Sequence, residues 1–493
     1  MNTKALRQKV LDLAIHGKLV PQNPNDESAT VLLEKIRAEK AEKIKKGELK
    51  ADKKDSFIFV GSDKRHYEQF ADGTVKDIED ETPFEVPEGW TWCRLGAIYF
   101  HTTGKALKKS NNKGTLKKYI TTSNLYWDSF DFTEVRSMYF TDDELEKCTI
   151  KKGDLVLCNG GDVGRAAIWN FDEDICYQNH VSRLRPKITG INNKLYLYLL
   201  MFYKEQGMLN GKGVGITSLS ANDLLSGLFP LPPINEQNQI VINIENIFSQ
   251  IDYLDEKKSD LQNAIKQAKS KILDLAIHGK LVSQDPNDEP AEDLLKRIAT
   301  SDNRPYEKIE EEPFEIPDSW KWVKLNDLAE IARGGSPRPI QDYITDSKDG
   351  INWIKIGDTS EESKYITSAK EKIKPEGKKH SRFVHAGDFL LTNSMSFGRP
   401  YILKIDGCIH DGWLVFANIK ECLLQDYLYY ALSSAYIYET FSNVAAGSTV
   451  KNLKSDTVKQ VDFPLPPLSE QKRIVGAIEN MYEVLDQIQN NLV

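Results

Sequence analysis

The longest regular pattern of apolar positions lies near the centre of the chain, between residues 240 and 275. Its apolar residues are alternately four and three positions apart over more than five heptads, and Lys258 is the only polar residue among them. This spacing keeps the side chains on one face of a helix and is typical of a coiled coil. At about 1.5 Å per residue, the helix would be a rod on the order of 60 Å long. The seam residues are Ile240, Ile244, Ile247, Ile251, Leu254, Leu261, Ile265, Ile272 and Leu275.

Both ends of the chain repeat parts of this helix. The C-terminal end repeats its front and the N-terminal end repeats its back, with residue 493 aligned to 259 and residue 1 to 263. The two ends together therefore match one complete helix. We predict a second rod, formed by both termini and antiparallel to the central one, in a cyclic pseudo-twofold arrangement. Its seam residues are Ile474, Ile478, Met481, Leu485, Ile488, Leu6, Val10 and Leu13.

The repeat extends over the whole chain. Lys9–Val20 and Lys271–Val282 are identical at eleven of twelve positions, at an offset of 262 residues. Three other blocks recur at offsets of 230 to 234: a Pro-Phe-Glu segment leading to two tryptophans (83–92 and 313–322), Gly-Asp followed by Gly-Arg (153–165 and 387–399), and Phe-Pro-Leu-Pro-Pro followed by Glu-Gln (229–237 and 463–471). Repeats of this kind indicate a duplicated structural unit.

The fall in offset from 262 to 230 means that the first copy has 32 extra residues, between about Ile36 and Pro83. This stretch is rich in Lys and Glu and has little apolar periodicity. It predicts a charged helix that runs into a flexible linker. The segment is either a tether or an extra surface for a partner, and its composition favours a tether.

Between the rods lie two units of about 150 residues with short β-rich runs, separated by Gly, Asn, Asp and Pro. Each unit is expected to be α+β, with a curved sheet and a few helices such as 196–203 and 426–438. The predicted fold class is therefore α+β, with two tandem domains separated by a pair of long antiparallel coiled-coil helices. The predicted domains are an N-terminal helical region at 1–46, a charged linker at 47–81, a first domain at 82–235, a central coiled-coil spacer at 236–299, a second domain at 300–467 that includes a short linker at 300–311, and a C-terminal half of the distal coiled coil at 468–493.

The composition is that of an ordinary soluble protein. The 493 residues are 40% hydrophobic and 28% charged, and no apolar run approaches the ~18 residues needed to cross a bilayer. The N-terminus has no apolar signal-peptide core. The six cysteines are scattered without a CxxC pair, so we expect reduced thiols, no metal site and a cytoplasmic protein.

The net charge of −8 conceals a segregation of charge. Residues 101–118 contain six lysines and no acid, and residues 364–385 contain seven Lys or Arg against two Glu. Local basic patches, and not the total charge, decide whether phosphates can be bound. The alternative is that these are ordinary solvated loops.

The two units share a frame but differ in their polar loops, which suits two related tasks with different specificity. Arg, Lys, Asn and Ser can read base edges in the major groove, and neighbouring lysines can hold phosphates. The candidate DNA-contacting residues of the first unit are Lys105, Lys108, Lys109, Lys117, Lys118, Thr121, Thr122, Asn124, Asn159 and Arg165. Those of the second unit are Arg333, Ser336, Arg338, Lys355, Asp358, Thr359, Asn393, Ser394 and Arg399.

Known catalytic motifs are missing from the sequence. Gly211-Lys212-Gly213 lacks the leading glycine and the Ser/Thr of a P-loop. Glu48-Leu49-Lys50 has the spacing of a nuclease site but no strand to hold a metal. His16 and His278 each precede a glycine at the expected end of a helix, which indicates capping and not catalysis. We therefore expect no catalytic residues in this chain.

The duplicated order of motifs resembles the specificity subunit of type I restriction-modification systems. The matching residues are the two LDLAIHGKLV segments (11–20 and 273–282), the two Phe-Pro-Leu-Pro-Pro…Glu-Gln segments, the two tryptophan entries and the Gly-Asp…Gly-Arg pairs. The resemblance covers essentially the whole chain. The departure from the family lies mainly in the charged insertion at 37–82.

The resemblance implies a non-catalytic DNA-binding subunit. Each unit would be a target recognition domain that reads one half of a bipartite, asymmetric double-stranded DNA sequence. The rods would set the spacing and hold two methyltransferase subunits, which carry S-adenosylmethionine and methylate adenine N6. Two restriction subunits, with ATP and Mg, could complete the assembly. The chain itself would bind no cofactor and no membrane.

Two alternatives come from other classes of protein. A structural coiled-coil bridge would not read DNA, and the divergence of the two loop sets argues against it. A free-standing bipartite repressor is disfavoured by the negative net charge and by the absence of a helix-turn-helix pattern.

Overall fold

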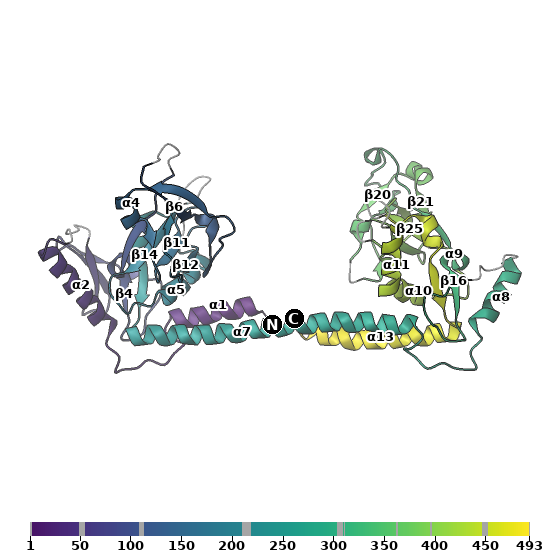
Figure 1. The fold of residues 1–493 in the computed structure, drawn as a ribbon, viewed down its shortest axis with the longest axis horizontal. Helices are drawn as coiled ribbons and strands as arrows, with labels where there is room; N and C mark the ends of the chain where they lie inside the picture. The colour runs from purple at the N-terminus through teal and green to yellow at the C-terminus, as the bar shows by residue number, and fades with distance from the viewer. Residues whose placement is uncertain are drawn as a thin grey trace. The chain divides into compact units, whose positions relative to one another are not determined.

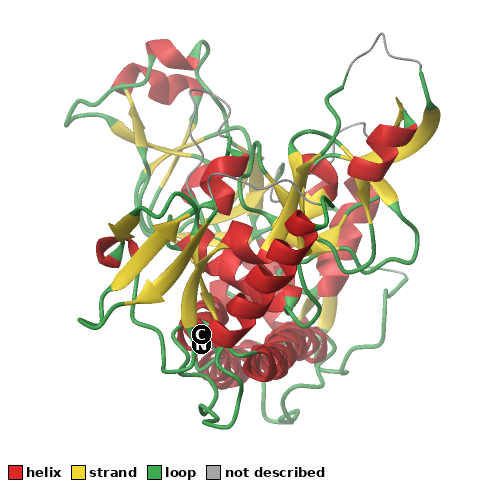
Figure 2. Cartoon of the chain, turned by 90° about the vertical axis from the view of Figure 1, so that its left-hand side faces the viewer, coloured by secondary structure: helices red, strands yellow, loops and turns green. Residues whose placement is uncertain are grey.

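The computed structural model describes residues 2–48, 55–107, 113–209, 218–302, 309, 311–360, 363–394, 397–445 and 452–492. The chain forms two compact units, Met1–Glu256 and Lys257–Val493 (Figure 1). Figure 2 draws strands in yellow and helices in red, and the globular part of each unit contains both, which confirms the predicted α+β class. In the part of the chain that is described, no helix is long and apolar enough to cross a membrane.

The globular part of the first unit contains two four-stranded sheets and a two-stranded ribbon. One sheet has the order β12-β11-β14-β5, the other β10-β13-β6-β9, and the ribbon pairs β15 with β4. The strands are β4 (Thr91–Arg94), β5 (Tyr99–Thr103), β6 (Thr115–Ile120), β9 (Arg136–Phe140), β10 (Thr149–Ile150), β11 (Leu155–Cys158), β12 (Ala166–Ile168), β13 (Ile175–Tyr177), β14 (Val181–Pro186) and β15 (Leu228–Leu231), with a small hairpin of β7 (Leu125–Tyr126) and β8 (Ser129–Phe130). The helices are α3 (Leu95–Ile98), α4 (Asp142–Lys147), α5 (Asn193–Glu205) and α6 (Ala221–Leu225).

The second unit repeats this arrangement. Its sheets have the orders β17-β25-β22-β23-β19 and β20-β18-β24-β21, and its ribbon pairs β16 with β26. The strands are β16 (Lys321–Lys324), β17 (Glu330–Arg333), β18 (Ile351–Ile354), β19 (Tyr365–Ile366), β20 (Glu371–Ile373), β21 (Arg382–Val384), β22 (Phe389–Thr392), β23 (Pro400–Leu403), β24 (Gly407–Ile409), β25 (Trp413–Ala417) and β26 (Asp462–Leu465). The helices are α8 (Ala291–Asp302), α9 (Leu325–Leu328), α10 (Gln425–Leu432), α11 (Ala435–Ala445) and α12 (Ser455–Lys459), so the single helix expected at 426–438 is in fact two.

The strand orders confirm the internal repeat at the level of topology. In both units the parallel pair is the same, β13 with β6 and β24 with β18, and each pair is flanked by antiparallel neighbours. The central strands of both units are buried and apolar, since β11 and β22 have no exposed residue. The duplicated motifs therefore lie at equivalent places in two copies of one scaffold.

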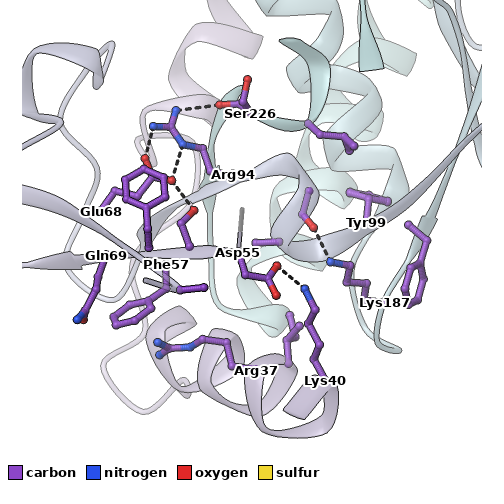
Figure 3. A pocket seen from close by; sticks show the side chains of 18 of the residues that line it. Arg37, Lys40, Asp55, Phe57, Glu68, Gln69, Arg94, Tyr99, Lys187 and Ser226 are labelled. Carbon is purple, nitrogen blue, oxygen red and sulfur yellow. Dashed lines mark hydrogen bonds and ion pairs between the residues drawn. The ribbon is translucent and has the colours of Figure 1, made fainter. Parts of the chain in front are cut away.

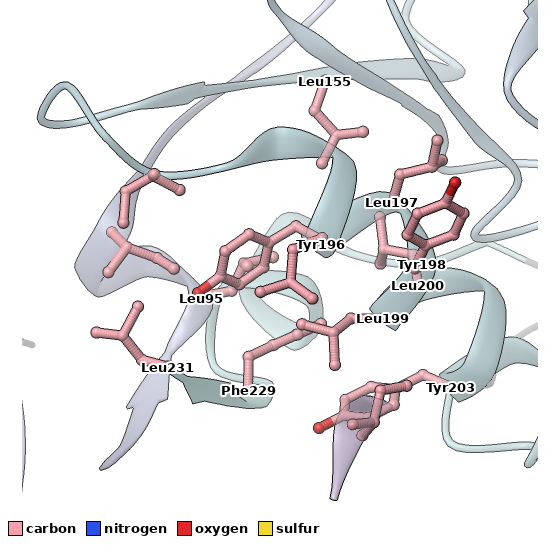
Figure 4. Close-up of a cluster of buried hydrophobic side chains, with 14 of the residues drawn as sticks. Leu95, Leu155, Tyr196, Leu197, Tyr198, Leu199, Leu200, Tyr203, Phe229 and Leu231 are labelled. Carbon is pink, nitrogen blue, oxygen red and sulfur yellow. The ribbon is translucent and has the colours of Figure 1, made fainter. Parts of the chain in front are cut away.

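The core of the first unit lies between the sheet and helix α5. Tyr196, Leu197, Leu199 and Leu200 on α5 pack with Phe229 of β15 in a continuous apolar cluster (Figure 4). Almost every position of α5 is buried, because the helix is covered by the sheet on one side and by α1 on the other. The second unit has the matching cluster around α10.

Helix α7 (Ile234–Ile277) is 44 residues long and continues from the first unit into the second. In the first unit, α1 (Thr3–Ile15) lies antiparallel to it: Arg7 forms an ion pair with Asp252, whereas Gln22, beyond the end of α1, donates to Glu236 over 2.7 Å. In the second unit, α13 (Leu468–Asn490) is antiparallel to the remaining part, and the Tyr482 hydroxyl donates to the Lys269 carbonyl over 3.1 Å. Each terminus therefore pairs with α7 in its own unit, as expected from the repeat.

The seam is continuous only next to the globular domains. The prediction that these residues are buried in the seam is wrong at five positions, because their side chains are exposed. They lie at the free ends of α1 and α13 and in the middle of α7: Leu6, Leu254, Leu261, Met481 and Ile488. The buried members are Val10, Ile240, Ile244, Ile251, Ile265, Ile474 and Ile478, and the half-buried ones are Leu13, Ile247, Ile272, Leu275 and Leu485. Near the domains, Leu273, Ala276 and Ile277 are also buried, because the helix there is covered on a wider face.

The expected helix caps are confirmed in both copies. α1 ends at Ile15, and the His16 Nδ1 lies 2.7 Å from the Asp12 carbonyl oxygen. His278 makes the same 2.7 Å contact with the Asp274 carbonyl at the end of α7. The glycine that follows has a φ of 63° in the first copy and 65° in the second, a conformation that suits glycine and terminates a helix.

The insertion in the first unit is not a simple tether. Its first part is the expected charged helix, α2 (Ala29–Lys45), but its second part folds into an antiparallel sheet of β1 (Ser56–Val60), β2 (His66–Phe70) and β3 (Val75–Asp77). Ile58 and Ile78 pack on Trp92 of the domain. The expectation of a flexible linker is therefore wrong for residues 55–81. The prediction failed because the apolar run at 57–60 is only four residues long and lies in a charged stretch.

This inserted sheet is fixed to the domain by a buried ion pair. Arg94, at the end of β4, donates to both carboxylate oxygens of Glu68, at 2.6 and 3.2 Å, and to Glu81 at 2.9 Å (Figure 3). The Glu68 side chain is only 5% exposed. Between α2, the sheet and the domain lies a groove of about 1290 Å³.

Candidate nucleic-acid interface

A pair of equivalent asparagines organises the loops at one end of each central strand. Asn159 follows β11, and its side-chain amide donates to the Asn179 carbonyl at 3.3 Å. Asn393 follows β22, and its amide donates to the Asp411 carbonyl at 2.9 Å. In both units the asparagine also bonds through its main chain to the strand-connecting loop opposite. Both residues were predicted to contact DNA. Asn393 is fully buried and supports its loop instead, whereas the DNA contact of the half-buried Asn159 stays a prediction.

A tightly packed glycine repeats in the same way. Gly104 and Gly334 follow the equivalent strands β5 and β17 and donate to the carbonyls of Val181 and Trp413. A Cβ atom on Gly334 would lie 2.3 Å from the His410 carbonyl oxygen, and one on Gly104 would be equally close to a carbonyl. Only glycine allows these two loops to come together, so the loop positions are set by the shared scaffold.

In the second unit, this scaffold gathers polar side chains around Asp411. Its Oδ1 accepts from the Ser336 hydroxyl at 3.0 Å, and its Oδ2 lies 3.4 Å from a terminal nitrogen of Arg338. The Nε of Arg333 donates to the Asp411 carbonyl at 2.9 Å. The prediction of Arg333, Ser336 and Arg338 as one group is supported by this proximity, while Asp411 was not predicted.

The surroundings of Asp411 are basic and accessible. The Arg338 side chain is 82% exposed, and Arg382, which is also exposed, donates to the Arg333 carbonyl at 3.0 Å. Burial lowers the pKa of His410, which lies 3.0 Å from Asp411. The Asp411 carboxylate opposes this shift, and the nearby Lys355, Arg333 and Arg338 add to it. Arg382 belongs to the basic stretch 364–385, so charge was the signal that could have identified it.

The equivalent place in the first unit carries different side chains. Asn179 stands where the second unit has Asp411, and Thr103 stands where it has Arg333, because the strand pairings align these positions. The His101 ring contacts the Ser182 hydroxyl at 2.9 Å, and burial lowers the pKa of this histidine. Thr103 and His180 are exposed beside them, and Lys108, at the position equivalent to Arg338, lies outside the described residues.

Several predicted residues of the first unit have structural roles. Lys105 is buried, donates to the Tyr139 carbonyl and forms an ion pair with Glu144, so it is not available to a phosphate. Thr121 and Asn124 are also buried and cap a short 3₁₀ turn. The prediction that these three contact DNA is corrected, because the fold already satisfies their polar atoms.

The other predicted residues of the first unit divide into two groups. Arg165 donates to the Thr122 carbonyl at 2.6 Å and lies over the Tyr126 ring, so both Arg165 and Thr122 are engaged within the unit. Lys117 and Lys118 are exposed on β6 and remain candidates for phosphate contact. Lys108 and Lys109 lie outside the described residues.

The remaining predictions in the second unit lie around a turn and a hairpin. Lys355 forms an ion pair with Glu371 at 2.5 Å, and Asp358 caps the 3₁₀ turn 356–358. Thr359 donates to a carbonyl of the same turn. Ser394 and Arg399 flank the β22–β23 connection and are half-buried. The buried Asn393 and the capping Asp358 are therefore corrected from direct readers to supporting residues.

The duplicated Glu-Gln motifs join each domain to its helix. Gln237 and Gln471 are fully buried; Gln471 accepts from the Leu424 amide at 2.8 Å and donates to the Cys422 carbonyl at 2.7 Å. Glu236 and Glu470 are buried next to them, and burial raises the pKa of both carboxyl groups. These residues join the helical part of each unit to its globular domain, in the second unit through the main chain of Leu424 and Cys422.

Sequence comparison places this architecture among known proteins. A family model described as "Type I restriction modification DNA specificity domain" matches residues 87–265 and 317–492, well over half of the chain. The chain belongs to this family. Each of the two matched segments includes one copy of the duplicated scaffold, which confirms the family resemblance seen in the sequence.

Individual relatives agree with this family. The chain is 26% identical to the "Type I restriction enzyme EcoEI specificity subunit" of Escherichia coli over 576 aligned residues, covering 99% of this chain and 90% of the relative. It is 25% identical to the "Type I restriction enzyme EcoAI specificity subunit" of Escherichia coli, covering 98% and 90%. Among solved structures, the HsdS subunit of Thermoanaerobacter tengcongensis has a TM-score of 0.53 at 18% identity, covering 83% of this chain and 92% of that one. At this identity the structural match shows the fold alone.

Proposed function

We propose that the chain is the non-catalytic DNA specificity subunit of a type I restriction-modification complex. The observation that carries the proposal is the repeated scaffold with two different sets of side chains at one equivalent place. The second unit presents Arg333, Ser336 and Arg338 there, and the first presents Thr103 and Asn179. A single scaffold with two chemistries suits the reading of two different half-sites.

In this proposal the domain at 82–235 reads one half of a bipartite target and the domain within 300–467 reads the other. Exposed lysines such as Lys117 and Lys118 hold phosphates, which gives affinity without sequence preference. The helical segments at 1–46, 236–299 and 468–493 act as the spacer. Because one helix, α7, continues from the first unit into the second, the spacer would give the two half-sites a fixed gap.

The helices also have the surface that a partner subunit needs. Leu6 and Leu254 in the first unit and Met481 and Ile488 in the second are large apolar side chains that are about 40% exposed. Rows of exposed apolar side chains on soluble helices indicate a protein interface. We propose that two adenine-N6 methyltransferase subunits, which bring S-adenosylmethionine, bind the helical spacer. Two restriction subunits with ATP and Mg would complete the nuclease.

The rival function is a coiled-coil bridge that does not read DNA. A bridge has no use for two chemically different loop sets on one scaffold, so the divergence around Asp411 and Asn179 favours DNA reading. The same divergence would serve a free-standing repressor. A repressor would act without a methyltransferase, which makes the two functions separable by experiment.

The test is single-molecule mapping of N6-methyladenine in cells with and without this gene, with the neighbouring methyltransferase gene intact. We expect a split motif with a fixed gap that is methylated only when the gene is present. Unchanged methylation after removal of the gene would contradict the proposal. A chain carrying a stop codon after the first unit is the control, since it should also abolish methylation of the complete split motif.

A further inference from the structure

Asp411 occupies a position at which the two units differ in charge but share most main-chain hydrogen bonds. The exception is the N–H of the residue itself, which donates to the Ser336 hydroxyl in the second unit, whereas the Asn179 N–H donates to the Lys105 carbonyl in the first. The main-chain bonds around it match those around Asn179: Gly334 and Gly104 donate to equivalent carbonyls, and the asparagine amide donates to residue 411 or 179 in each unit. The aspartate is therefore not required to build the loop, because the first unit builds the same loop with an asparagine. Its carboxylate must serve the side chains around it.

Those side chains are the hydrogen-bond donors that converge on this residue. The carboxylate accepts from Ser336 and lies within 3.4 Å of Arg338, and the carbonyl of the same residue accepts from Arg333. Two arginines thus converge on one residue. Because the Arg338 side chain is 82% exposed and uses only one terminal nitrogen for this contact, the other edge of its guanidinium faces solvent. A guanidinium held at one edge keeps a planar pair of donors available for a ligand.

The geometry of the arginines suits a base edge, and the Asp411 carboxylate offsets part of their positive charge. A carboxylate beside the arginines repels a phosphate, whereas the O6 and N7 atoms of guanine are neutral acceptors that match the fork of an arginine. Asp411 keeps its negative charge at neutral pH, since His410 and Ser336 hold the pKa of its carboxyl below the usual range although burial opposes this. In the first unit Thr103 stands in place of Arg333, so we expect its half-site to have a different base preference at the equivalent position.

We propose that Asp411 is a positioning residue that holds Arg333 and Arg338 to read a guanine in the half-site of the second unit. This inference rests on the proposed function and adds to it the kind of base and the residue that controls the choice. Asp411 acts through the arginines and need not touch the DNA.

The experiment is selection from a randomised double-stranded DNA library by the full chain in complex with its methyltransferase subunit. The wild-type complex should select a split motif that contains a guanine in one half. Arg338→Lys keeps the charge but loses the fork, so we expect the preference for that guanine to fall about 10- to 100-fold, with the other half-site unchanged. Asp411→Asn should lower the same preference, and should have no further effect when Arg338→Lys is already present.

Two controls keep the outcomes distinct. Asn179→Asp in the first unit provides a carboxylate without arginines and should not create a guanine preference. Lys348→Ala removes an exposed positive charge from the second unit, and it should at most weaken all sequences equally. The inference is overturned if Arg338→Lys and Asp411→Asn retain the wild-type base preference at every position, or if Arg338→Ala weakens all sequences equally. If the wild-type complex selects no split motif, the proposed function fails, and this inference fails with it.

Discussion

The two units of this protein share a scaffold and differ in what the scaffold carries. Equivalent strands, glycines and asparagines place the loops in the same way, but the first unit carries Asn179 and the second carries Asp411 at the same backbone position. The difference teaches that the side chains at this position can diverge on one fold, because the glycine N–H groups and the asparagine amides hold the loops in both units. A second difference is the inserted sheet, which only the first unit has among the described residues.

The largest contrast in stability should come from Arg94 and its counterpart Lys324. Arg94→Ala leaves the buried carboxylate of Glu68 without its partner, and we expect a loss of about 3–5 kcal/mol in the local stability of the inserted sheet. Lys324→Ala removes a partly exposed ion pair with Asp462 and should cost about 1 kcal/mol or less. Hydrogen exchange of β1–β3 and of β16–β26 measures both effects. Equal losses would mean that the inserted sheet is not held by Arg94.

The next contrast concerns the glutamines that join each domain to its helix. Gln471 makes three hydrogen bonds to main-chain groups and Gln237 makes two. Each buried main-chain group left unsatisfied costs about 1–3 kcal/mol, so Gln471→Ala should destabilise the second unit more than Gln237→Ala destabilises the first. Thermal unfolding followed by hydrogen exchange at Leu424 and Asn192 gives the two values. The reverse order would contradict this account of the junction.

A smaller effect should separate phosphate contact from base reading. Lys117→Ala and Lys118→Ala should weaken binding to all DNA sequences alike, and each should reduce the slope of log K against log salt by about 1. Lys472→Ala, on the exposed surface of α13, is the matched control and should leave the slope unchanged. A change of base preference in Lys117→Ala would show that this lysine reads bases.

The smallest effect is a dependence on pH at the two junction carboxylates. Burial raises the pKa of Glu236 and Glu470 above the ordinary value of 4.5. The folded protein therefore binds these protons more tightly than the unfolded chain, so the stability that they contribute is present below pH 4.5 and is lost as the pH rises through the raised pKa. Glu236→Gln should reduce the fall in the free energy of unfolding as the pH rises. Glu470→Gln should act in the same way in the second unit, because burial is the main cause of the raised pKa there too, while Arg473 and Asp288 act in opposite directions. Unfolding at pH 4.5 and pH 7 measures both, and a pH dependence that neither substitution changes would contradict the assignment.

Much of the fold could be predicted from the sequence because short local motifs recur in both copies of the repeat. The helix seam, the capping His16 and His278, and the two matching domains all follow from residues that are close in sequence. The prediction of a buried seam was wrong at Leu254 and Leu261, because burial at these positions depends on how far the partner helices extend along α7. The inserted sheet was missed because its core residues, Ile58 among them, are few and lie in a charged stretch.

The candidate site was less predictable, because a polar residue in a loop can either read DNA or support the loop. Asn393 and Thr121 are residue types that can contact bases, but in the structure their hydrogen bonds to other parts of the fold support the loops. Asp411 gave no signal in the sequence, since an aspartate in a basic site looks unfavourable until its contacts with Ser336 and Arg338 are known. Candidate base-reading residues can thus be identified only after the structure has shown which polar residues support the loops.

The most direct test of the central claim is to lengthen the spacer and map N6-methyladenine again. One heptad inserted after Lys258 adds about 10 Å of helix, which corresponds to roughly three base pairs. The insertion is made at the point where the repeats of the two termini meet. The account predicts that both half-sequences are unchanged and that only the gap between them grows. An unchanged gap, or an altered half-sequence with the original gap, would contradict the claim that two independent readers are held apart by one helical spacer.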